Sequence, residues 1–220
     1  MKTQFRDRSE AGELLAEQLT AYANKPNVIV LALPRGGVPV GAQVARKLNV
    51  PLDVFVVRKL GLPGHPELAM GAIASGGVRV FNGDVINSLR IPDEVIESVT
   101  AGEFEELQRR ERTYRDDLPP PEVEGKIVIV VDDGIATGAT MAAAVAALRQ
   151  LRAGRIVVAA PTMARSTYDY LRTNADDVVG VMLPEEFYSV GQWYEDFSQT
   201  SDDEVRELLA RAQTTQSIAA

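Results

Sequence analysis

Two adjacent carboxylates followed by a loop of small residues are the most distinctive chemical feature of this sequence. Asp132 and Asp133 come directly after the apolar run Ile127–Val131, and small residues and threonines occupy positions 134–140. Because the run is β-branched throughout, it is typical of a strand buried on both faces of a parallel sheet. The Ala-rich segment 141–151 that follows is predicted to be a helix. A strand, a pair of acids and a helix start therefore follow one another along the chain.

The helix start is predicted to bind an anion. Backbone N–H groups in the first turn of a helix have no partner within it and, with the helix dipole, favour a negative group. A phosphate beside two carboxylates is repelled unless another group lies between them. A ribose does so, because its vicinal hydroxyls donate to Asp132 and Asp133 while its 5-phosphate occupies the loop. The order of residues thus predicts a cradle for ribose 5-phosphate. The loop positions expected to contact the phosphate are Ala136, Thr137, Gly138, Ala139 and Thr140.

Three other interpretations account for parts of the same segment. In a purely structural corner, the acids would cap the helix and the small residues would only pack. A P-loop requires Gly-Lys-Ser/Thr, which the segment lacks, and a dinucleotide site requires Gly-x-Gly-x-x-Gly after the first strand, which is also missing. The cradle is the interpretation that uses the acids and the loop together.

The composition narrows the remaining possibilities. The chain has 220 residues, 45% hydrophobic and 25% charged, which suits one α/β domain with a small elaboration at one end. Its formal net charge of −8 opposes nonspecific nucleic-acid binding. The lack of cysteine excludes disulfides and Cys-ligated metals, and the single histidine, His65, excludes a His-cluster zinc site and argues against a Ser-His-Asp triad. No apolar run could span a bilayer and the N-terminus lacks an apolar leader core, so we expect a cytoplasmic protein with no membrane partner.

Hydrophobic periodicity predicts strands alternating with helices, and hence a mostly parallel sheet covered by helices on both faces. Gly76-Gly77 predicts a hairpin, whereas segment 58–67, with its glycines and prolines, is predicted to be a loop. Ligands in such folds bind at the carboxyl ends of strands, so the loops at Pro34, Arg58 and Asp132 should converge on one cleft. The predicted strands are 28–33, 53–57, 70–75, 78–81, 127–131, 156–159 and 178–183. The predicted helices are 9–23, 38–48, 93–115, 141–151, 166–172 and 201–212, with a linker at 118–125 and a frayed tail at 213–220.

Residues 128–140 resemble the signature of the type I phosphoribosyltransferases. That signature has an apolar strand, two acidic residues, two variable positions, and a small residue followed by Thr-Gly-x-Thr, which here is Ala-Thr-Gly-Ala-Thr at 136–140. Gly134 departs from it, because the family usually has a larger apolar residue there. The resemblance covers about 28–183 and, with Pro-Arg-Gly-Gly at 34–37 and Val-Gly-Gln-Trp-Tyr at 190–194, extends to a group of uncharacterised bacterial phosphoribosyltransferases. It implies an α/β core at 1–183, and a small aromatic hood with the last helix and tail at 184–220.

The resemblance also assigns the loop after the first strand of the sheet. In the family this loop binds pyrophosphate, and here it contains Pro34, Arg35 and Gly36. A cis peptide bond is expected between Pro34 and Arg35. The alternative is an ordinary turn at a helix start, with Arg35 facing solvent.

A basic residue at the end of the second strand is a further family feature, and Arg58 and Lys59 match it. A mobile loop after it closes over the pyrophosphate and excludes water. His65 lies in this predicted loop and either donates to the pyrophosphate or is simply exposed.

By resemblance, the protein is expected to bind the magnesium complex of phosphoribosyl pyrophosphate and to transfer ribose 5-phosphate to a nitrogenous acceptor, a base, releasing pyrophosphate. The Mg²⁺ would be bound mainly through the pyrophosphate of the substrate, without a metal site of the protein's own. The alternatives are a sensor that keeps the cradle and has lost transfer, and an enzyme for another ribose 5-phosphate compound. A homodimer is compatible with each. The expected catalytic residues are Asp133, Arg35, Arg58 and Lys59.

The aromatic segment 184–199 corresponds to the family's hood over the acceptor. Neither a helix nor a strand would place all of its aromatic residues on one face. We expect Trp193 or a neighbouring aromatic residue to cover the acceptor, since the polar edges of Trp193 and Tyr194 suit a partly wet cleft. The alternative is that the rings only attach the last helix to the sheet. The aromatic residues of this segment are Phe187, Tyr188, Trp193, Tyr194 and Phe197.

Overall fold

The structure is a computed structural model and describes residues 3–115 and 118–219. The described part of the chain leaves out Met1, Lys2 and Ala220, the last of which belongs to the predicted tail. It also leaves out the side chains of 66–67 and 215–219. No helix among the described residues is long and apolar enough to cross a membrane.

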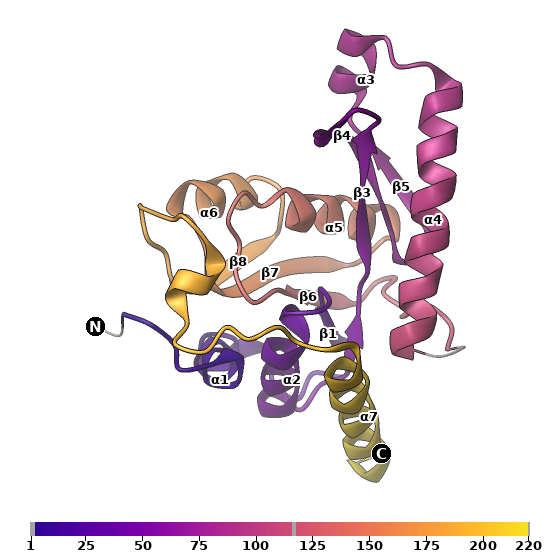
Figure 1. The fold of residues 1–220 in the computed structure, drawn as a ribbon. Helices are drawn as coiled ribbons and strands as arrows, with labels where there is room; N and C mark the ends of the chain where they lie inside the picture. The colour runs from indigo at the N-terminus through magenta and orange to yellow at the C-terminus, as the bar shows by residue number, and fades with distance from the viewer. Residues whose placement is uncertain (1–2, 116–117, 220) are drawn as a thin grey trace.

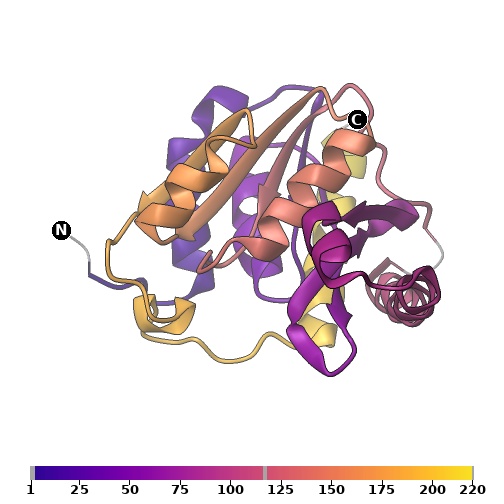
Figure 2. The ribbon, with the colours of Figure 1, turned by 90° about the horizontal axis from the view of Figure 1, so that it is seen from above.

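The main sheet has five parallel strands in the order β2-β1-β6-β7-β8. Helices α1, α2 and α7 cover one face, and α5 and α6 cover the other (Figure 1, Figure 2). The predicted fold class is therefore confirmed. The strands are β1 (Val28–Ala32), β2 (Leu52–Val54), β6 (Ile127–Val131), β7 (Arg155–Thr162) and β8 (Asp177–Met182). The covering helices are α1 (Arg8–Gln18), α2 (Gly37–Leu48), α5 (Ala139–Gln150), α6 (Arg165–Leu171) and α7 (Asp202–Ala219).

The central strands are buried on both faces, as their β-branched sequence predicts. In β6, Ile129 and Val131 belong to the apolar cluster under α1, α2 and α7, whereas Val128 and Val130 belong to the cluster under α5. Strands β1 and β6 run in register, with Ala32 opposite Val131. Their carboxyl ends therefore lie side by side.

A second, antiparallel sheet of order β3-β4-β5 corrects the prediction for segment 58–67, which is not a loop. The chain leaves the main sheet after Val54, so the predicted strand 53–57 ends early. The glycines that suggested a loop accommodate two register shifts around Gly61 and a turn with positive φ at Gly64. The predicted hairpin at Gly76-Gly77 is confirmed by the pairing of β4 with β5. The strands are β3 (Val57–Leu62), β4 (His65–Ala74) and β5 (Val78–Phe81).

The long helix α4 (Asp93–Arg115) has the predicted bounds and lies along the outside of the antiparallel sheet (Figure 1). Arg115 attaches its end to the main sheet through a bidentate ion pair with Asp53 at 2.8 Å. The short helix α3 (Gly83–Leu89), which was not predicted, precedes it. The last helix, α7, continues to Ala219, where a frayed tail was predicted from residue 213. The described residues also form the 3₁₀ turns η1 (Thr20–Tyr22), η2 (Ser75–Gly77) and η3 (Val190–Trp193).

Candidate functional site

Two loops meet where β1 and β6 end, at the point where the order of strands reverses. Ligands of open α/β sheets bind at such a point. The Leu33 N–H donates to the Val131 carbonyl at 2.8 Å. A Cβ atom on Gly36 would lie only 2.0 Å from Oδ2 of Asp133. The loop at 34–37 and the acidic pair are therefore in direct contact, and the peptide bond between Pro34 and Arg35 is cis, as predicted.

The loop at 134–140 has the geometry of an anion site. Gly138 has φ of 75°, and the first α-helical hydrogen bond of α5 runs from the Ala142 N–H to the Gly138 carbonyl. The N–H groups before Ala142 are thus left to face the loop. The side chains of Thr137 and Thr140 are exposed, and their hydroxyls bond to no other described residue. This loop can donate several hydrogen bonds to a phosphate.

Contacts from α6 and the hood hold the same loop in place. The Thr167 hydroxyl donates to the Ala136 carbonyl at 2.5 Å. A Cβ atom on Gly134 would lie 2.4 Å from a methyl carbon of Val190. The glycine that departs from the family signature therefore leaves room for the hood to pack on the loop.

Asp132 and Asp133 lie side by side and are differently bound. Asp133 is buried, 9% exposed, and its Oδ2 accepts a hydrogen bond from Nε of Arg8 at 2.8 Å. Its backbone N–H donates to Oδ1 of Asp132 at 2.9 Å. Burial, and then the negative charge of Asp133, raise the pKa of the Asp132 carboxyl well above its ordinary value. Hydroxyl donors from a ribose would meet one carboxylate fixed by an arginine and a second that holds a proton more readily.

Arg8 was missed by the sequence reasoning. It belongs to α1, 125 residues before its partner, and reads locally as a charged residue at a helix start. One terminal nitrogen donates to the Ser198 carbonyl at 2.7 Å, and the guanidinium lies 4.0 Å from the centroid of the Phe197 ring. Arg8 therefore connects the hood to the acidic pair. No spacing in the sequence signals such a contact.

The aromatic residue that reaches the acidic pair is Tyr194. Its side chain is buried, and its hydroxyl donates to the Asp133 carbonyl at 2.5 Å. Burial raises the pKa of this hydroxyl, and the charge of Asp133 adds to the shift. Trp193 instead packs on Phe187, with ring centroids 6.0 Å apart, and its carbonyl accepts from the Phe5 N–H. Its indole N–H is buried and meets no acceptor among the described residues.

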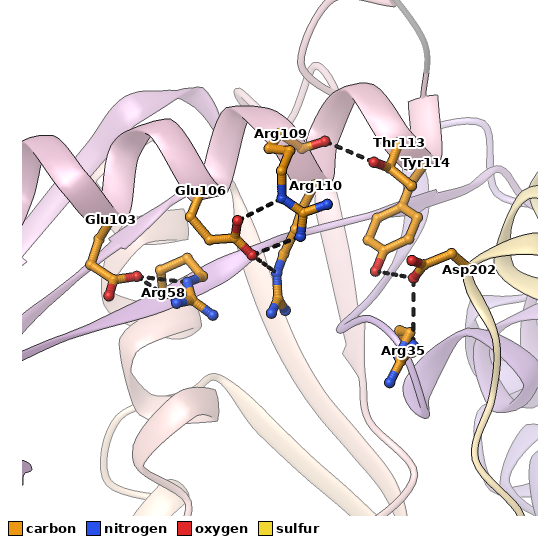
Figure 3. A network of polar contacts seen from close by, with 9 residues as sticks. All are labelled: Arg35, Arg58, Glu103, Glu106, Arg109, Arg110, Thr113, Tyr114 and Asp202. Carbon is orange, nitrogen blue, oxygen red and sulfur yellow. Dashed lines mark hydrogen bonds and ion pairs between the residues drawn. The ribbon is translucent and has the colours of Figure 1, made fainter.

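The predicted basic residues lie on three different surfaces. Arg35 faces Asp202 at the start of α7, at 3.7 Å, and Asp202 also accepts from the Tyr114 hydroxyl at 2.9 Å (Figure 3). Arg58 and Lys59 are not at the end of a main-sheet strand but within β3. Because side chains alternate along a strand, Arg58 pairs with Glu103 of α4 at 2.7 Å while Lys59 lines a groove on the opposite face. His65, at the tip of the β3–β4 hairpin, is exposed.

The groove beside Lys59 has a volume of about 750 Å³ and runs between α5 and the antiparallel sheet. It includes Ala139 and Thr140 from the outer side of the phosphate loop, but neither Asp132 nor Asp133. Alanine side chains of α5 and β4 line part of it, together with polar side chains such as Lys59, Asp84 and Arg149. The groove therefore adjoins the site and does not contain the acidic pair.

A protein metal site is not formed by the described residues, which contain no group of three or more His, Asp and Glu side chains that could hold an ion. Mg²⁺ commonly takes one or two carboxylates and completes its shell with substrate phosphates and water. Asp132 and Asp133 fit that limited role.

Comparison with known proteins agrees with this geometry. Residues 6–191 match the family model of the phosphoribosyl transferase domain. Proteins from two strains of Mycobacterium tuberculosis, provisionally named phosphoribosyl transferases, are 46% identical over 208 residues, which is 94% of this chain. The chain spans about half the length of these relatives, 47% of each. A crystal structure of a Thermus thermophilus protein superposes with a TM-score of 0.84 at 40% identity, covering 94% of this chain and 98% of the other.

Proposed function

The chain belongs to the phosphoribosyl transferase family, and from that premise we propose that it binds the magnesium complex of phosphoribosyl pyrophosphate and transfers ribose 5-phosphate to a nitrogenous base. One observation carries the proposal. The acidic pair lies between the phosphate loop and the loop at Pro34–Arg35, which it contacts through Gly36. Ribose 5-phosphate with pyrophosphate on C1 has the same order of groups: phosphate, two hydroxyls, pyrophosphate.

Each part of this substrate meets a matching group. Exposed Thr137 and Thr140 and the free N–H groups of α5 would hold the 5-phosphate. Asp132 and Asp133 would accept from the ribose hydroxyls. Arg35 would face the pyrophosphate, since its distance of 3.7 Å from Asp202 is longer than a charge-assisted hydrogen bond and leaves the guanidinium loosely held.

The transfer breaks the bond between C1 and the pyrophosphate oxygen and forms a bond between C1 and a nitrogen of the acceptor. The electron pair of the broken bond leaves with pyrophosphate, where Arg35 stabilises the charge that develops. The acceptor nitrogen loses a proton, and Asp132 suits its uptake because the pKa of that carboxyl is raised. Bound Mg²⁺, held by the pyrophosphate with at most one carboxylate of the acidic pair, would neutralise further charge on the leaving group.

The hood would cover the acceptor and exclude water from the activated sugar. Tyr194 and Phe197 lie beside Arg8 at the acidic pair and are placed to border the base. Trp193, expected to cover the acceptor, packs on Phe187 in the same segment.

The test is to incubate the protein with phosphoribosyl pyrophosphate, Mg²⁺ and a panel of purines and pyrimidines. Pyrophosphate and the nucleotide product are then measured by mass spectrometry. We expect both products in equal amounts with at least one base. Failure to bind phosphoribosyl pyrophosphate by calorimetry would refute the proposal. Binding without pyrophosphate release for every base would favour the sensor.

A further inference from the structure

Helix α4 carries a cation, Arg110, on the side where Arg35 of the pyrophosphate loop also lies (Figure 3). Arg110 is not part of the family signature. Figure 3 shows Arg58, Arg110 and Arg35 in a row on one side of α4, each beside one carboxylate. Arg110 occupies the middle of this row. Its neighbour in sequence, Arg109, binds the same Glu106 carboxylate (Figure 3).

The guanidinium of Arg110 is held by one nitrogen and presents the others. Its Nε donates to Oε1 of Glu106 at 2.8 Å, and its terminal nitrogens donate to no other residue that the structure describes. Glu106 also accepts two hydrogen bonds from Arg109, at 2.6 and 2.9 Å. Hydrogen bonds from Arg109 and Arg110 lower the pKa of Glu106 to about 2, so this carboxylate stays ionised. The three side chains together carry one net positive charge.

The charges of Arg110 and Arg35 both act on the hydroxyl of Tyr114. Burial and the hydrogen bond to Asp202 raise the pKa of Tyr114 to about 12, and the charges of Arg110 and Arg35 oppose that rise. Arg110 stands one helical turn before Tyr114, about 6 Å along the helix and on the same face. Arg35 therefore contacts the Tyr114–Asp202 pair directly, and Arg110 lies between this pair and Arg58 (Figure 3).

We propose that Arg110 is a further pyrophosphate-binding residue, which with Arg35 forms a two-arginine clamp around the leaving group. This inference rests on the proposed function. A pyrophosphate carries several negative charges, and the planar fork of an arginine suits its oxygens. Glu106 fixes the guanidinium in advance, so little rotamer freedom is lost when the ligand binds.

Arg58 is a weaker candidate for the same role. Its partner Glu103 lies eleven residues before Tyr114 on α4, about 16 Å along the helix axis. Two nitrogens of Arg58, Nε and Nη2, also both lie 2.7 Å from Oε2 of Glu103, so the charge of Arg58 is already paired. Arg110 therefore lies nearer to the pyrophosphate loop than Arg58 does.

The test compares Arg110→Gln with Arg109→Gln by calorimetry, using magnesium pyrophosphate, ribose 5-phosphate and phosphoribosyl pyrophosphate as separate probes. Both arginines share Glu106, but Arg109 is 60% exposed against 32% for Arg110. Either variant leaves Glu106 one arginine partner, so folding should survive, and a melting curve checks this.

We expect Arg110→Gln to weaken magnesium pyrophosphate and phosphoribosyl pyrophosphate about 10- to 100-fold, the size of one lost hydrogen bond to charge, with ribose 5-phosphate unchanged. Arg109→Gln should bind all three probes like the wild type. Equal pyrophosphate affinity in wild type and Arg110→Gln would overturn the inference while leaving the proposed function standing. If the wild type binds none of the three probes, the proposed function fails and the clamp fails with it.

If Arg110→Gln does not fold, Arg110→Lys replaces it. Lysine retains the charge without the planar fork, so pyrophosphate binding should weaken less than in Arg110→Gln, and an unchanged affinity would count against the clamp.

Discussion

Replacing Arg8 by glutamine tests whether the hood is attached to the acidic pair through a buried charge. The Arg8 and Asp133 side chains are only 12% and 13% exposed, so the substitution leaves a carboxylate buried without its cation. One hydrogen bond to charge is worth about 1.5–3 kcal/mol, and the lost bond to the Ser198 carbonyl adds about 1. Water that enters the open site solvates the Asp133 carboxylate and offsets part of this loss of stability. We therefore expect Arg8→Gln to lower the free energy of unfolding by about 2–3 kcal/mol.

The cost of Arg8→Gln should also depend on pH. The pKa of Asp132 is raised in the folded state, first by burial and then by the charge of Asp133, while Arg8 opposes the rise. A carboxyl with a raised folded pKa binds its proton more tightly when folded, so its ionisation costs stability at neutral pH. That cost disappears as pH falls toward the ordinary aspartate value of about 3.9. Without Arg8 the cost is larger, so the loss of stability should be greater at pH 8 than at pH 5.

Urea unfolding of wild type and Arg8→Gln, at both pH values, measures these effects. Arg6→Gln is the matched control. The Arg6 side chain is 66% exposed and pairs with Asp7 at the surface, and the bond to Glu10 comes from the Arg6 backbone N–H, so the substitution should leave stability unchanged. Asp133→Asn provides the second arm: with the buried charge gone, removing Arg8 should cost clearly less. If Arg8→Gln costs as much in the Asp133→Asn variant as in the wild type, the coupling is refuted.

Three further variants test the cradle by calorimetry. Thr137→Ala with Thr140→Ala should weaken phosphoribosyl pyrophosphate by several kcal/mol, at about 1.5–3 for each lost hydrogen bond to charge, and unchanged affinity in the folded variant would remove the phosphate assignment. Asp132→Asn should weaken ribose 5-phosphate but barely affect inorganic phosphate, whereas an equal loss for both would indicate a collapsed loop. Gly36→Ala should weaken phosphoribosyl pyrophosphate at least tenfold, since its Cβ would meet the Asp133 carboxylate at 2.0 Å; wild-type binding would show that the loops can move apart.

The parts of the site that the sequence predicted are those in which neighbours in sequence are also neighbours in space. The strand Ile127–Val131, the two acids and the loop before α5 form one continuous segment, and the structure has the strand and the following helix in the predicted order. Helix α4 was predicted with its correct bounds because its length and charged face leave little choice of structure. In these segments local periodicity and tertiary packing require the same conformation.

The β3–β4 hairpin was mistaken for a loop because its local and tertiary signals disagree. Gly61, Pro63 and Gly64 are common in turns, and only the last two form one. Arg58 and Lys59 are polar neighbours of a kind that is unusual in a buried strand, yet one is paired with α4 and the other faces a groove. The strand exists because α4 and β4 cover it, which periodicity over six residues does not reveal.

The residues that sequence reasoning missed are contributed by elements far from the signature. Arg8 of the first helix pairs with Asp133, and Arg110, which we propose as a pyrophosphate-binding residue, belongs to the long helix. Tyr194, one of the aromatic residues expected in the hood, donates to the Asp133 carbonyl. The acceptor differs between reactions of this type, whereas ribose 5-phosphate and pyrophosphate do not, so the groups that contact the acceptor need not be part of a shared motif. The lone departure from the signature follows the same logic: Gly134 is small because Val190 of the hood packs against it. The identity of the acceptor is therefore to be sought where the N-terminal helix and the hood meet, at Arg8 and Tyr194.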